Sequence, residues 1–384
     1  MTRLVADWLD SPAAQAVAGA LEAAGHQALF VGGCVRNALL GAPVADLDVA
    51  TDARPEAVHA IADAAGLRAV PTGIDHGTIT VIHETVPIEV TTFRHDVETF
   101  GRHATVRFST DVAEDARRRD FTMNALYADV RGVIQDPVGE GLADLAARRL
   151  RFVGDADARV KEDFLRILRF FRFHAWYADP DGGMDSEALA ACAAGAEGLD
   201  HISEERLGAE MKKLLSAPDP SFALAAMAQT GVLAHVLPAA DPAPVARLIH
   251  LSPEPDPVLR LAALGGNDVA DRLRLSRAEA RRRESLLKAA RSDAGAAELA
   301  WRHDAAEARA MVSLRAALTA MPLADGLADA LDAGARAAFP IRPQDLMPAY
   351  EGPALGARLG QLERAWLATG MTASRDHLLA LPDE

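Results

Sequence analysis

The sequence predicts an α+β fold, with a mixed β-sheet and its covering helices in the N-terminal part and helices alone in the rest of the chain. Short runs rich in β-branched residues occur in the first part and give out after the segment 136–154. From Val160 onward the pattern is helical with proline and glycine breaks, and alanine is strongly enriched from Asp179. A chain of 384 residues is too long for one core of ordinary size, so two or three domains are expected.

The elements of the N-terminal part follow from local patterns. An alanine-rich amphipathic pattern predicts a helix over 4–24, and the apolar run ALFV predicts a buried strand over 28–31. Gly41 is a suitable C-terminal cap for a helix over 35–40. The elements expected next are a strand over 45–51, a helix that begins at Pro55, and strands over 77–83 and 87–93. The segment Arg94–Thr110 has no sustained apolar period, which predicts a long, partly mobile loop.

Charge is distributed unevenly along the chain. The formal net charge is −15 at pH 7, which by itself disfavours a nucleic-acid partner because phosphates would be repelled. Arginines are nevertheless contiguous over 117–119, and Arg166, Arg169 and Arg172 recur at every third position. Local basic surfaces that bind RNA are therefore compatible with the acidic composition.

The sequence has no stretch that approaches the roughly 18 consecutive apolar residues of a membrane span. Its N-terminal residues include acids where a signal peptide would carry a basic run, so we expect a cytoplasmic protein without a membrane partner. Cys34 and Cys192 are far apart and form no CxxC or Cys/His pattern, so both are expected to be buried thiols. The sequence does not indicate the oligomeric state.

Asp46 and Asp48 are separated by a single apolar residue within the predicted strand 45–51. Alternate residues of a strand project on the same face, so the two carboxylates are expected side by side, with Leu47 facing the core. Adjacent like charges are unfavourable unless a cation lies between them, and Mg²⁺ prefers carboxylate oxygens. The pair fits two-metal phosphoryl transfer, although an exposed strand end can carry the same pattern.

A glycine pair precedes these aspartates. Gly32 and Gly33 lie between a predicted strand and a predicted helix, where backbone N–H groups can approach phosphate oxygens at the positive end of the helix. Arg36 lies one helical turn further and is expected to reach the same anion. Glu89, on a later predicted strand, is the candidate for a third carboxylate. Together these residues indicate a triphosphate held beside metal ions.

Five motifs occur in the order found in one enzyme family. They are VGGCVRNALLG followed by DLD, then IEVTTFR, RRDFTMNALYAD, EDFLRILRFFRF and ISEERLGAEMKKLL, all within residues 29–215. In these motifs the sequence resembles the nucleotidyltransferases that add CCA to tRNA 3′ ends, in the class that also contains bacterial poly(A) polymerases. The resemblance implies a polymerase β-like nucleotidyltransferase head over 1–154, a helical neck over 155–225, and a helical body and tail over 226–384 that bind tRNA.

The resemblance also implies a template-independent activity. The tRNA 3′ hydroxyl would attack the α-phosphate of CTP or ATP and expel pyrophosphate, with Mg²⁺ as the cofactor. Asp46 and Asp48 are then the metal ligands and, with Glu89, the catalytic residues. The residues expected to bind the nucleotide are Gly32, Gly33, Arg36, Arg119, Asp120, Asn124, Asp163, Arg166, Arg169 and Arg172.

The motif RRRDFTMNALY is expected to be helical, with Asp120 and Asn124 one turn apart. Arg119 can reach a phosphate, and the side chains of Asp120 and Asn124 can hydrogen-bond sugar hydroxyls. Arg117 and Arg118 can equally be a solvated basic run.

The motif EDFLRILRFFRF is expected to form one helix. Its apolar side is expected to contain Phe164, Ile167, Leu168 and Phe171. Glu162, Arg166 and Arg169 fall on the opposite side, and Asp163 neighbours Arg166 through the i,i+3 relation. Arg169 and Arg172 match family positions that line the nucleotide site, although Arg172 is rotated away from the other two arginines. A surface ladder of acids and arginines that supports the helix is the structural alternative.

An aspartate beside an arginine can select the base. Cytosine and adenine both present an exocyclic amine beside an unprotonated ring nitrogen, so the carboxylate accepts from the amine and the guanidinium donates to the ring nitrogen. Uracil and guanine present the opposite order and would be refused. By resemblance these roles belong to Asp163 and Arg166.

The sequence departs from the family pattern at a few positions. Asn37 stands where the family commonly has Asp, and we expect activity to survive this change. Phe100 and Ala104 lie in the predicted loop where many relatives have polar or proline residues, and this loop is thought to govern the change from C to A addition. The pair His303–Asp304 is similar to metal-dependent HD phosphohydrolases, but the sequence offers no further ligands at a suitable spacing.

Two other functions stay open. A poly(A) polymerase, or an enzyme that adds only A, shares the head motifs, whereas the motif ISEERLGAEMKKLL and the length of the chain favour tRNA. A non-catalytic RNA-binding or nucleotide-sensing module is disfavoured because all three carboxylates are present.

Overall fold

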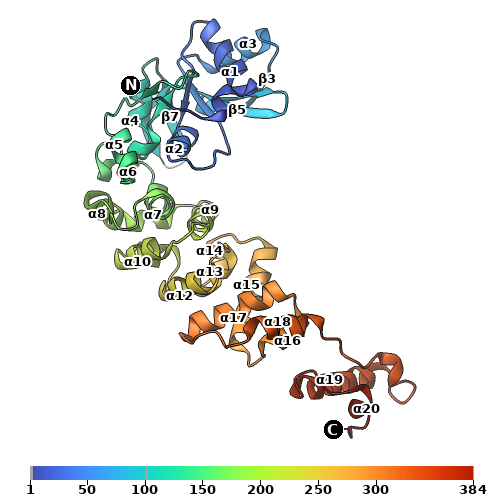
Figure 1. Ribbon diagram of the computed structural model, residues 1–384. Coiled ribbons are helices and arrows are strands. Elements are labelled where there is room, and N and C mark those ends of the chain that lie inside the picture. The colour runs from blue at the N-terminus through green and yellow to red at the C-terminus, as the bar shows by residue number, and fades with distance from the viewer. Residues whose placement is uncertain (1–2, 101–102, 384) are drawn as a thin grey trace. The chain divides into compact units, whose positions relative to one another are not determined.

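The computed structural model of the chain describes residues 3–100 and 103–383, which separate into two compact units (Figure 1). The first unit extends to Ala239 and includes Asp271–Arg274, and the second contains the remaining residues from 240 onward. The predicted head and neck both fall within the first unit. The domain boundaries at 154 and 225 stay predictions.

A seven-stranded mixed sheet lies in the N-terminal part of the first unit. Its strands are β1 (Leu29–Val31), β2 (Asp48–Thr51), β3 (Arg68–Gly73), β4 (Thr78–His83), β5 (Val86–Thr92), β8 (Tyr127–Ala128) and β9 (Ile134–Gln135). They lie in the order β3, β4, β5, β2, β1, β8, β9, and only β2 and β5 are parallel neighbours. The sheet confirms the predicted α+β class.

The strands predicted over 28–31, 77–83 and 87–93 correspond to β1, β4 and β5, and the C-terminal half of the segment 45–51 forms β2. β3 was not predicted because it is partly exposed along its length and contains proline and glycine, which disfavour a strand pattern. β8 and β9 are only two residues long and therefore show no alternation.

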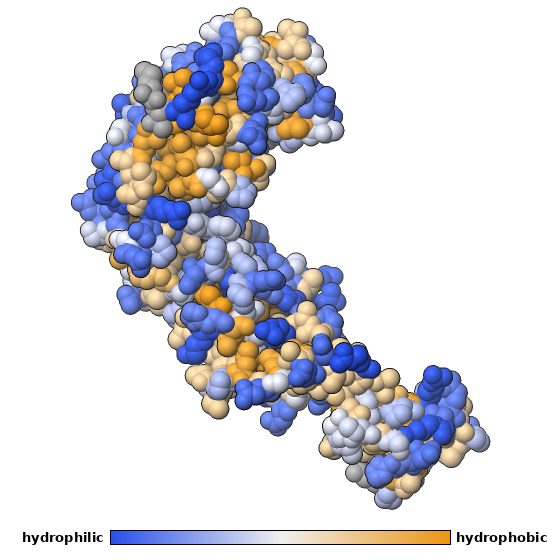
Figure 2. Space-filling model, in the orientation of Figure 1, coloured by the Kyte–Doolittle hydropathy of each residue, from blue (hydrophilic) through white to orange (hydrophobic). Residues whose placement is uncertain are grey.

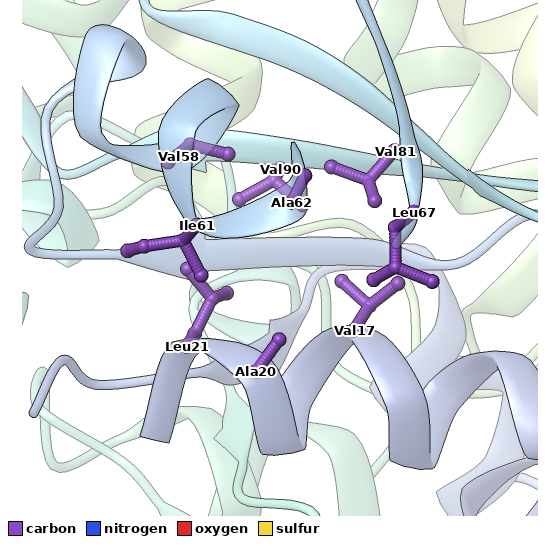
Figure 3. A pocket seen from close by; sticks show the side chains of 9 residues that line it. All are labelled: Val17, Ala20, Leu21, Val58, Ile61, Ala62, Leu67, Val81 and Val90. Atoms are coloured by element: carbon purple, nitrogen blue, oxygen red, sulfur yellow. The ribbon is translucent and has the colours of Figure 1, made fainter. Parts of the chain in front are cut away.

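Two helices, α1 (Pro12–Ala23) and α3 (Pro55–Ala64), pack on the sheet over β4 and β5. Apolar side chains from both helices meet Val81 and Val90 of the strands, as Figure 3 shows. The cavity between them has a volume of about 10 Å³, at the lower limit for a single water. This interior is a tightly packed core between the two helices and the sheet.

The first helix begins later than predicted. Ser11 accepts a hydrogen bond from the backbone N–H of Ala14, and Pro12 occupies the first helical position, where a missing N–H costs nothing. The residues before this cap form a short 3₁₀ helix, η1 (Asp7–Asp10), so the single helix expected over 4–24 is wrong.

The segment expected to be a long loop is a β-hairpin. β6 (Arg94–Phe100) and β7 (His103–Phe108) pair antiparallel in a sheet of their own. The loop prediction over 94–110 is therefore wrong, because a two-stranded ribbon is held by backbone hydrogen bonds and needs no sustained apolar period. The side chains of Phe100 and Ala104 lie outside the described residues.

The rest of the first unit is helical, as predicted beyond Val160. Its remaining helices are α2 (Gly33–Leu39), η2 (Ile74–His76), α4 (Val112–Arg117), η3 (Thr122–Asn124), α5 (Gly141–Ala146), α6 (Ala156–Glu162), α7 (Leu165–Tyr177), α8 (Ser186–Ala194), η4 (Ala196–His201), α9 (Glu204–Leu215), α10 (Ser221–Gln229) and α11 (Val232–Val236). Cys34 and Cys192 are buried free thiols, as expected.

The second unit is helical in its described residues. Its helices are α12 (Ala243–Leu251), α13 (Pro257–Leu264), α15 (Arg277–Arg291), α16 (Ala296–Arg302), α17 (Ala305–Thr319), α18 (Leu327–Arg336), η5 (Pro343–Asp345), α19 (Gly352–Ala368) and α20 (Arg375–Leu379), and α14 (Val269–Arg272) lies where the chain changes unit. No helix among the described residues is long and apolar enough to cross a membrane. Figure 2 shows hydrophilic residues over much of the face in view.

Candidate active site

Asp48 and Glu89 lie directly opposite each other on the parallel strands β2 and β5. The backbone N–H of Glu89 donates to the carbonyl of Leu47 at 3.2 Å, so the pairing continues one residue before β2. Burial is the main cause that raises the pKa of Asp48, and the negative charges of Glu89 and Asp46 raise it further. The positive charge of Arg119 lowers this pKa and so opposes the shift. The fold thus brings the third predicted carboxylate to the predicted aspartate pair.

Asp46 precedes the strand, whereas the sequence predicts it within the strand. β2 begins at Asp48, and residues 42–47 form an irregular connection. The side-chain amide of Asn37 donates to the carbonyl of Pro43 at 2.7 Å, which ties this connection back to α2 and delays its entry into the sheet. Asp46 is consequently exposed, and Leu47 is half-buried.

These carboxylates suit a hard cation chemically. Only burial and neighbouring charges contribute to the pKa shift of Asp48, with no hydrogen bond to offset its negative charge. Mg²⁺ is commonly held by one or two carboxylates together with oxygens of a bound phosphate. Within the described part of the chain, no three His, Cys, Asp or Glu side chains converge on one point, so substrate oxygens would have to complete such a site.

Gly32 turns the chain from β1 into α2. Its φ of +72° lies in the region that favours glycine, and its position is the N-cap of α2. A Cβ at position 32 would lie 3.5 Å from Nη1 of Arg119, and a Cβ at Gly33 would lie 3.9 Å from Nη2 of Arg36. Because neither residue has a side chain, the backbone of this turn lies close to two guanidinium groups, and backbone N–H groups in such a turn can bind an anion.

Arg119 is held by two residues that the sequence analysis did not single out. Its Nε donates to the hydroxyl of Tyr127 at 2.9 Å, and its Nη2 donates to Asp115 at 3.0 Å. Asp115 is 1% exposed and also accepts from Tyr127 and from Arg118. Burial alone would raise the pKa of Asp115, but Arg119 and Arg118 lower it to about 2. The i,i+4 spacing of Asp115 and Arg119 was the available sequence signal.

Four predicted residues form one continuous hydrogen-bonded network. Nη1 of Arg36 donates to Oδ1 of Asn124 at 2.5 Å, and Nδ2 of Asn124 donates to Oδ1 of Asp120 at 2.9 Å. Nε of Arg169, from α7, donates to the other oxygen of Asp120 at 2.8 Å. Burial opposes ionisation of Asp120, yet Arg169 and the hydrogen bonds lower its pKa to about 2. The network joins α2 and η3 to α7.

The helix predicted for RRRDFTMNALY is wrong, because only Thr122–Asn124 forms a turn of 3₁₀ helix. The backbone N–H of Phe121 donates to Oδ1 of Asp120, which favours a local turn over a continuous helix. Asp120 and Asn124 nevertheless meet, because the turn brings them within hydrogen-bond distance.

Arg36 is enclosed by aromatic rings from the end of α7. Its guanidinium carbon lies 4.0 Å from the ring centre of Tyr177 and 5.1 Å from that of Phe173. Its Nη2 donates to the Tyr177 hydroxyl and to the amide oxygen of Asn37. The donors of Arg36 therefore point into the protein, so a phosphate contact by Arg36 requires an exchange of one of these hydrogen bonds. Sequence reasoning missed Tyr177, whose i,i+4 spacing from Phe173 was the only signal.

The motif EDFLRILRFFRF is interrupted at Asp163. α6 ends at Glu162, Asp163 has φ −151° and ψ 105°, and α7 begins at Leu165, so the single helix is wrong. The carboxylate of Asp163 caps α7 by accepting from the backbone N–H of Leu165, which explains the break. Arg206 of α9 donates to the other oxygen of Asp163 at 2.7 Å.

Arg166 does not pair with Asp163 through its side chain. Its Nη1 donates to Glu162 at 2.6 Å, and its Nη2 donates to the carbonyl of Arg118 at 3.2 Å. Asp163 and Arg166 are thus fixed independently, each by its own partner. Contact of both groups with one base, as the predicted base selection requires, would exchange some of these hydrogen bonds.

The three arginines at every third position have partners on different elements. The pairs are Arg166 with Glu162, Arg169 with Asp120, and Arg172 with Glu210 of α9. None of the three acids belongs to α7, so a ladder along the surface of that helix does not account for these pairs. Of the predicted apolar side, Ile167, Leu168 and Phe171 are fully buried, whereas Phe164 is half-buried.

The pair His303–Asp304 has a structural explanation. Asp304 is the N-cap of α17 and accepts from the backbone N–H of Glu307 at 2.7 Å. His303 is exposed in the connection that precedes this helix. The HD dipeptide therefore reflects helix capping.

Two protein families match parts of the chain. The Poly A polymerase head domain matches residues 28–151. The probable RNA and SrmB-binding site of polymerase A matches residues 183–243. The first match contains the carboxylates, the glycine turn and Arg119.

Known relatives and a solved structure share much of the chain. It is 34% identical over 379 residues to the mitochondrial CCA tRNA nucleotidyltransferase 1 of Mus musculus, covering 92% of this chain and 86% of the mouse protein. It is 43% identical over 210 residues to the CCA-adding enzyme of Geobacillus thermodenitrificans, covering 54% and 50% of the two chains. The structure of the Bacillus stearothermophilus CCA-adding enzyme in complex with CTP matches with a TM-score of 0.73 and 29% identity, covering 94% of both chains.

Proposed function

Because the chain belongs to the family of CCA-adding tRNA nucleotidyltransferases, we propose that it adds C, C and A to the tRNA 3′ end from CTP and ATP without a nucleic-acid template. The observation that carries the proposal is the register of β2 against β5, which sets Asp48 opposite Glu89. The positive charge of Arg119 acts on the carboxylate of Asp48. Carboxylates for a metal and a cation for phosphate are the two requirements of nucleotidyl transfer.

In the proposed reaction Asp46 and Asp48 hold Mg²⁺, with Glu89 beside them. When bound, Mg²⁺ would supply activation of the tRNA 3′ hydroxyl and stabilisation of the leaving pyrophosphate. Asp46 comes from the irregular connection and is exposed, whereas Asp48 lies at the start of β2 and is fixed by strand pairing.

The phosphates of the nucleotide are proposed to bind at the glycine turn. Gly32 and Gly33 place no side chain at this turn, and Arg119 lies beside it with a guanidinium oriented by Asp115 and Tyr127. Arg36 lies beside the same turn from α2. Because Arg119 is pre-oriented, little side-chain entropy is lost when it binds an anion.

The sugar and the base are proposed to lie against the network that joins η3 to α7. Asp120 and Asn124, with Arg169 behind them, supply hydrogen bonds for ribose hydroxyls. Asp163 accepts from the exocyclic amine and Arg166 donates to the ring nitrogen that C and A share. Arg172 supports this wall through Glu210.

The test is incorporation into tRNA transcripts that end at the discriminator base, at C, or at CC. Purified protein with Mg²⁺ is given CTP, ATP or both, and the products are sequenced. Growth that stops at CCA supports the proposal. Addition of A alone to the CC end indicates division of labour with a second enzyme, and long A tails on unrelated RNA indicate a poly(A) polymerase. A folded protein that incorporates no more than an Asp46→Ala/Asp48→Ala variant overturns the proposed activity.

A further inference from the structure

The outward face of α15 carries a line of basic side chains that the proposed chemistry does not use. Arg277, Arg281, Lys288 and Arg291 are all exposed. At 100° per residue these positions lie within about 40° of one line along the helix, and at 1.5 Å per residue they extend over about 21 Å. We call these four residues the α15 basic stripe.

The opposite face of α15 is packed and neutralised. Leu286, Ala289 and Ala290 are buried there, and the helix packs against α13 and α17. Arg282, which points to this side, is paired with Asp256 at 2.6 Å and with Glu307 at 3.0 Å. The inward arginine of α15 thus has carboxylate partners, whereas the stripe faces solvent. The cations of the stripe are therefore accessible to an external partner.

Polar groups surround the stripe. A hollow of about 400 Å³ lies beside Lys288 and is bordered by Ser285, Ser292, Arg302 and His303. Its one acid, Glu298, is already paired with Arg302 at 2.9 Å. Within the line of the stripe itself, Glu284 is the one acidic position, and it divides Arg281 from Lys288. The surface is therefore net positive on a protein of net charge −15.

We propose that the α15 basic stripe, with the hollow beside Lys288, binds the phosphate backbone of the RNA substrate. The inference rests on the proposed function, and it names the surface of the second unit that contacts tRNA. Because the acidic remainder of the protein repels RNA, attraction must be confined to local basic surfaces, and this stripe matches a polyphosphate in charge and in length. Contacts to phosphates suit a substrate population that shares shape and differs in sequence.

An anionic membrane is the other polyanion to consider. A helix that lies on a lipid surface needs large apolar side chains beside its cations. The exposed positions beside or within the stripe, Ala278 and Glu284, are small or acidic, and the large apolar neighbour, Leu287, is half-buried. The observations therefore favour RNA.

The experiment compares the full-length triple variant Arg277→Gln/Arg281→Gln/Lys288→Gln with a control of equal charge, Arg54→Gln/Arg309→Gln/Arg336→Gln, whose three arginines are also exposed. The Kd for tRNA lacking CCA is measured between about 50 and about 200 mM salt. Each duplex phosphate contact contributes about 0.9 to the slope of log K against log salt, so the stripe variant should lose about 2 to 3 from this slope and bind roughly tenfold more weakly. Glu284→Gln should bind more tightly than the wild type.

The kinetic readout separates this inference from the proposed activity. The stripe variant should raise KM for tRNA while leaving KM for CTP and the rate at saturating tRNA unchanged. Equal Kd values and salt slopes for the stripe variant and the control, with both proteins folded by circular dichroism, overturn the inference. Retention on vesicles of phosphatidylserine, lost in the stripe variant while tRNA binding is kept, overturns it in favour of a membrane. Absence of incorporation by the wild type overturns the proposed function, whereas the binding comparison still decides the role of the stripe.

Discussion

Arg169 and Asp120 form an ion pair between α7 and the sheet-containing part of the same unit. Nε of Arg169 lies 2.8 Å from Oδ2 of Asp120, and the second carboxylate oxygen is occupied by Asn124 and by the backbone of Phe121. Asp120 is 9% exposed, so its charge depends on these partners. The residues that are proposed to bind the ribose are therefore also residues that hold two parts of the unit together.

Stability should fall in acid through Asp115 and Asp120. Both have a folded-state pKa of about 2, below the ordinary value of 3.8. The unfolded chain therefore takes up protons at a higher pH than the folded protein, and the free energy of unfolding decreases as the pH falls from about 4 to about 2. Each group contributes about 2 kcal/mol above this range. Urea unfolding between pH 6 and pH 2 measures the loss.

The matched variant is Asp120→Asn, which cannot titrate. Its stability at neutral pH should be lower than that of the wild type, and its decrease towards acid pH should be smaller. An unchanged slope in this variant would show that Asp120 is not one of the groups responsible.

Breaking the pair of Arg172 with Glu210 should destabilise the packing of α7 against α9. Nε of Arg172 lies 2.6 Å from Oε2 of Glu210, and the two side chains are 12% and 6% exposed. Glu210→Ala leaves a guanidinium without its partner in a poorly hydrated site, which costs about 3 kcal/mol in the free energy of unfolding. Chemical denaturation measures this loss. The double variant Arg172→Met/Glu210→Leu should recover part of the stability, and additive losses would contradict a direct interaction.

Removal of the proposed catalytic carboxylate Asp48 should greatly reduce incorporation without unfolding the protein. Asp48→Asn keeps the shape of the side chain and removes the negative charge that lies opposite Glu89. We therefore expect activity to fall by roughly 10³-fold or more, which corresponds to several kcal/mol of transition-state stabilisation. Because burial and Glu89 raise the pKa of Asp48, its removal should not lower thermal stability. A variant with more than a tenth of wild-type activity would exclude Asp48 from the chemistry.

Base selection should depend on Asp163 and Arg166 and, indirectly, on Arg206. Asp163→Ala removes the acceptor for the exocyclic amine, which should reduce discrimination between CTP and UTP by about 1–3 kcal/mol. Arg206→Lys keeps a charge near Asp163 and changes its geometry, so a smaller loss is expected. The ratio of kcat/KM for CTP and UTP measures both effects. Discrimination that is unchanged in Asp163→Ala would place base selection elsewhere.

Gly32 offers a test of the phosphate site with a close control. Gly32 and Gly25 both have a positive φ, +72° and +86°, so alanine is strained at either position. Only at Gly32 would the added Cβ approach Arg119, whereas it meets nothing within 4 Å at Gly25. Gly32→Ala should raise KM for CTP and ATP, and Gly25→Ala should lower stability by about 1 kcal/mol with KM unchanged. Equal effects on KM would indicate backbone strain alone.

Residues that are close in the sequence were predicted well. The glycine turn, the strand that carries Asp48, the helix that begins at Pro55 and the helical second half of the chain all follow from local pattern. The helix boundaries were predicted less well, because they depend on single capping contacts. Ser11 delays α1, and the carboxylate of Asp163 divides one predicted helix into α6 and α7.

The sequence by itself determined the kinds of chemical group available, namely carboxylates, glycines and arginines in a fixed order, because their identity and spacing need no folded context. The partners of these groups were decided only by the tertiary structure. Asp115 and Tyr127 hold Arg119, Tyr177 encloses Arg36, and Glu210 holds Arg172. These partners come from separate elements of the fold, so the sequence does not show which acid pairs with which arginine. Packing decides the pairing, because a buried charge is stable only where the fold places a counter-charge beside it.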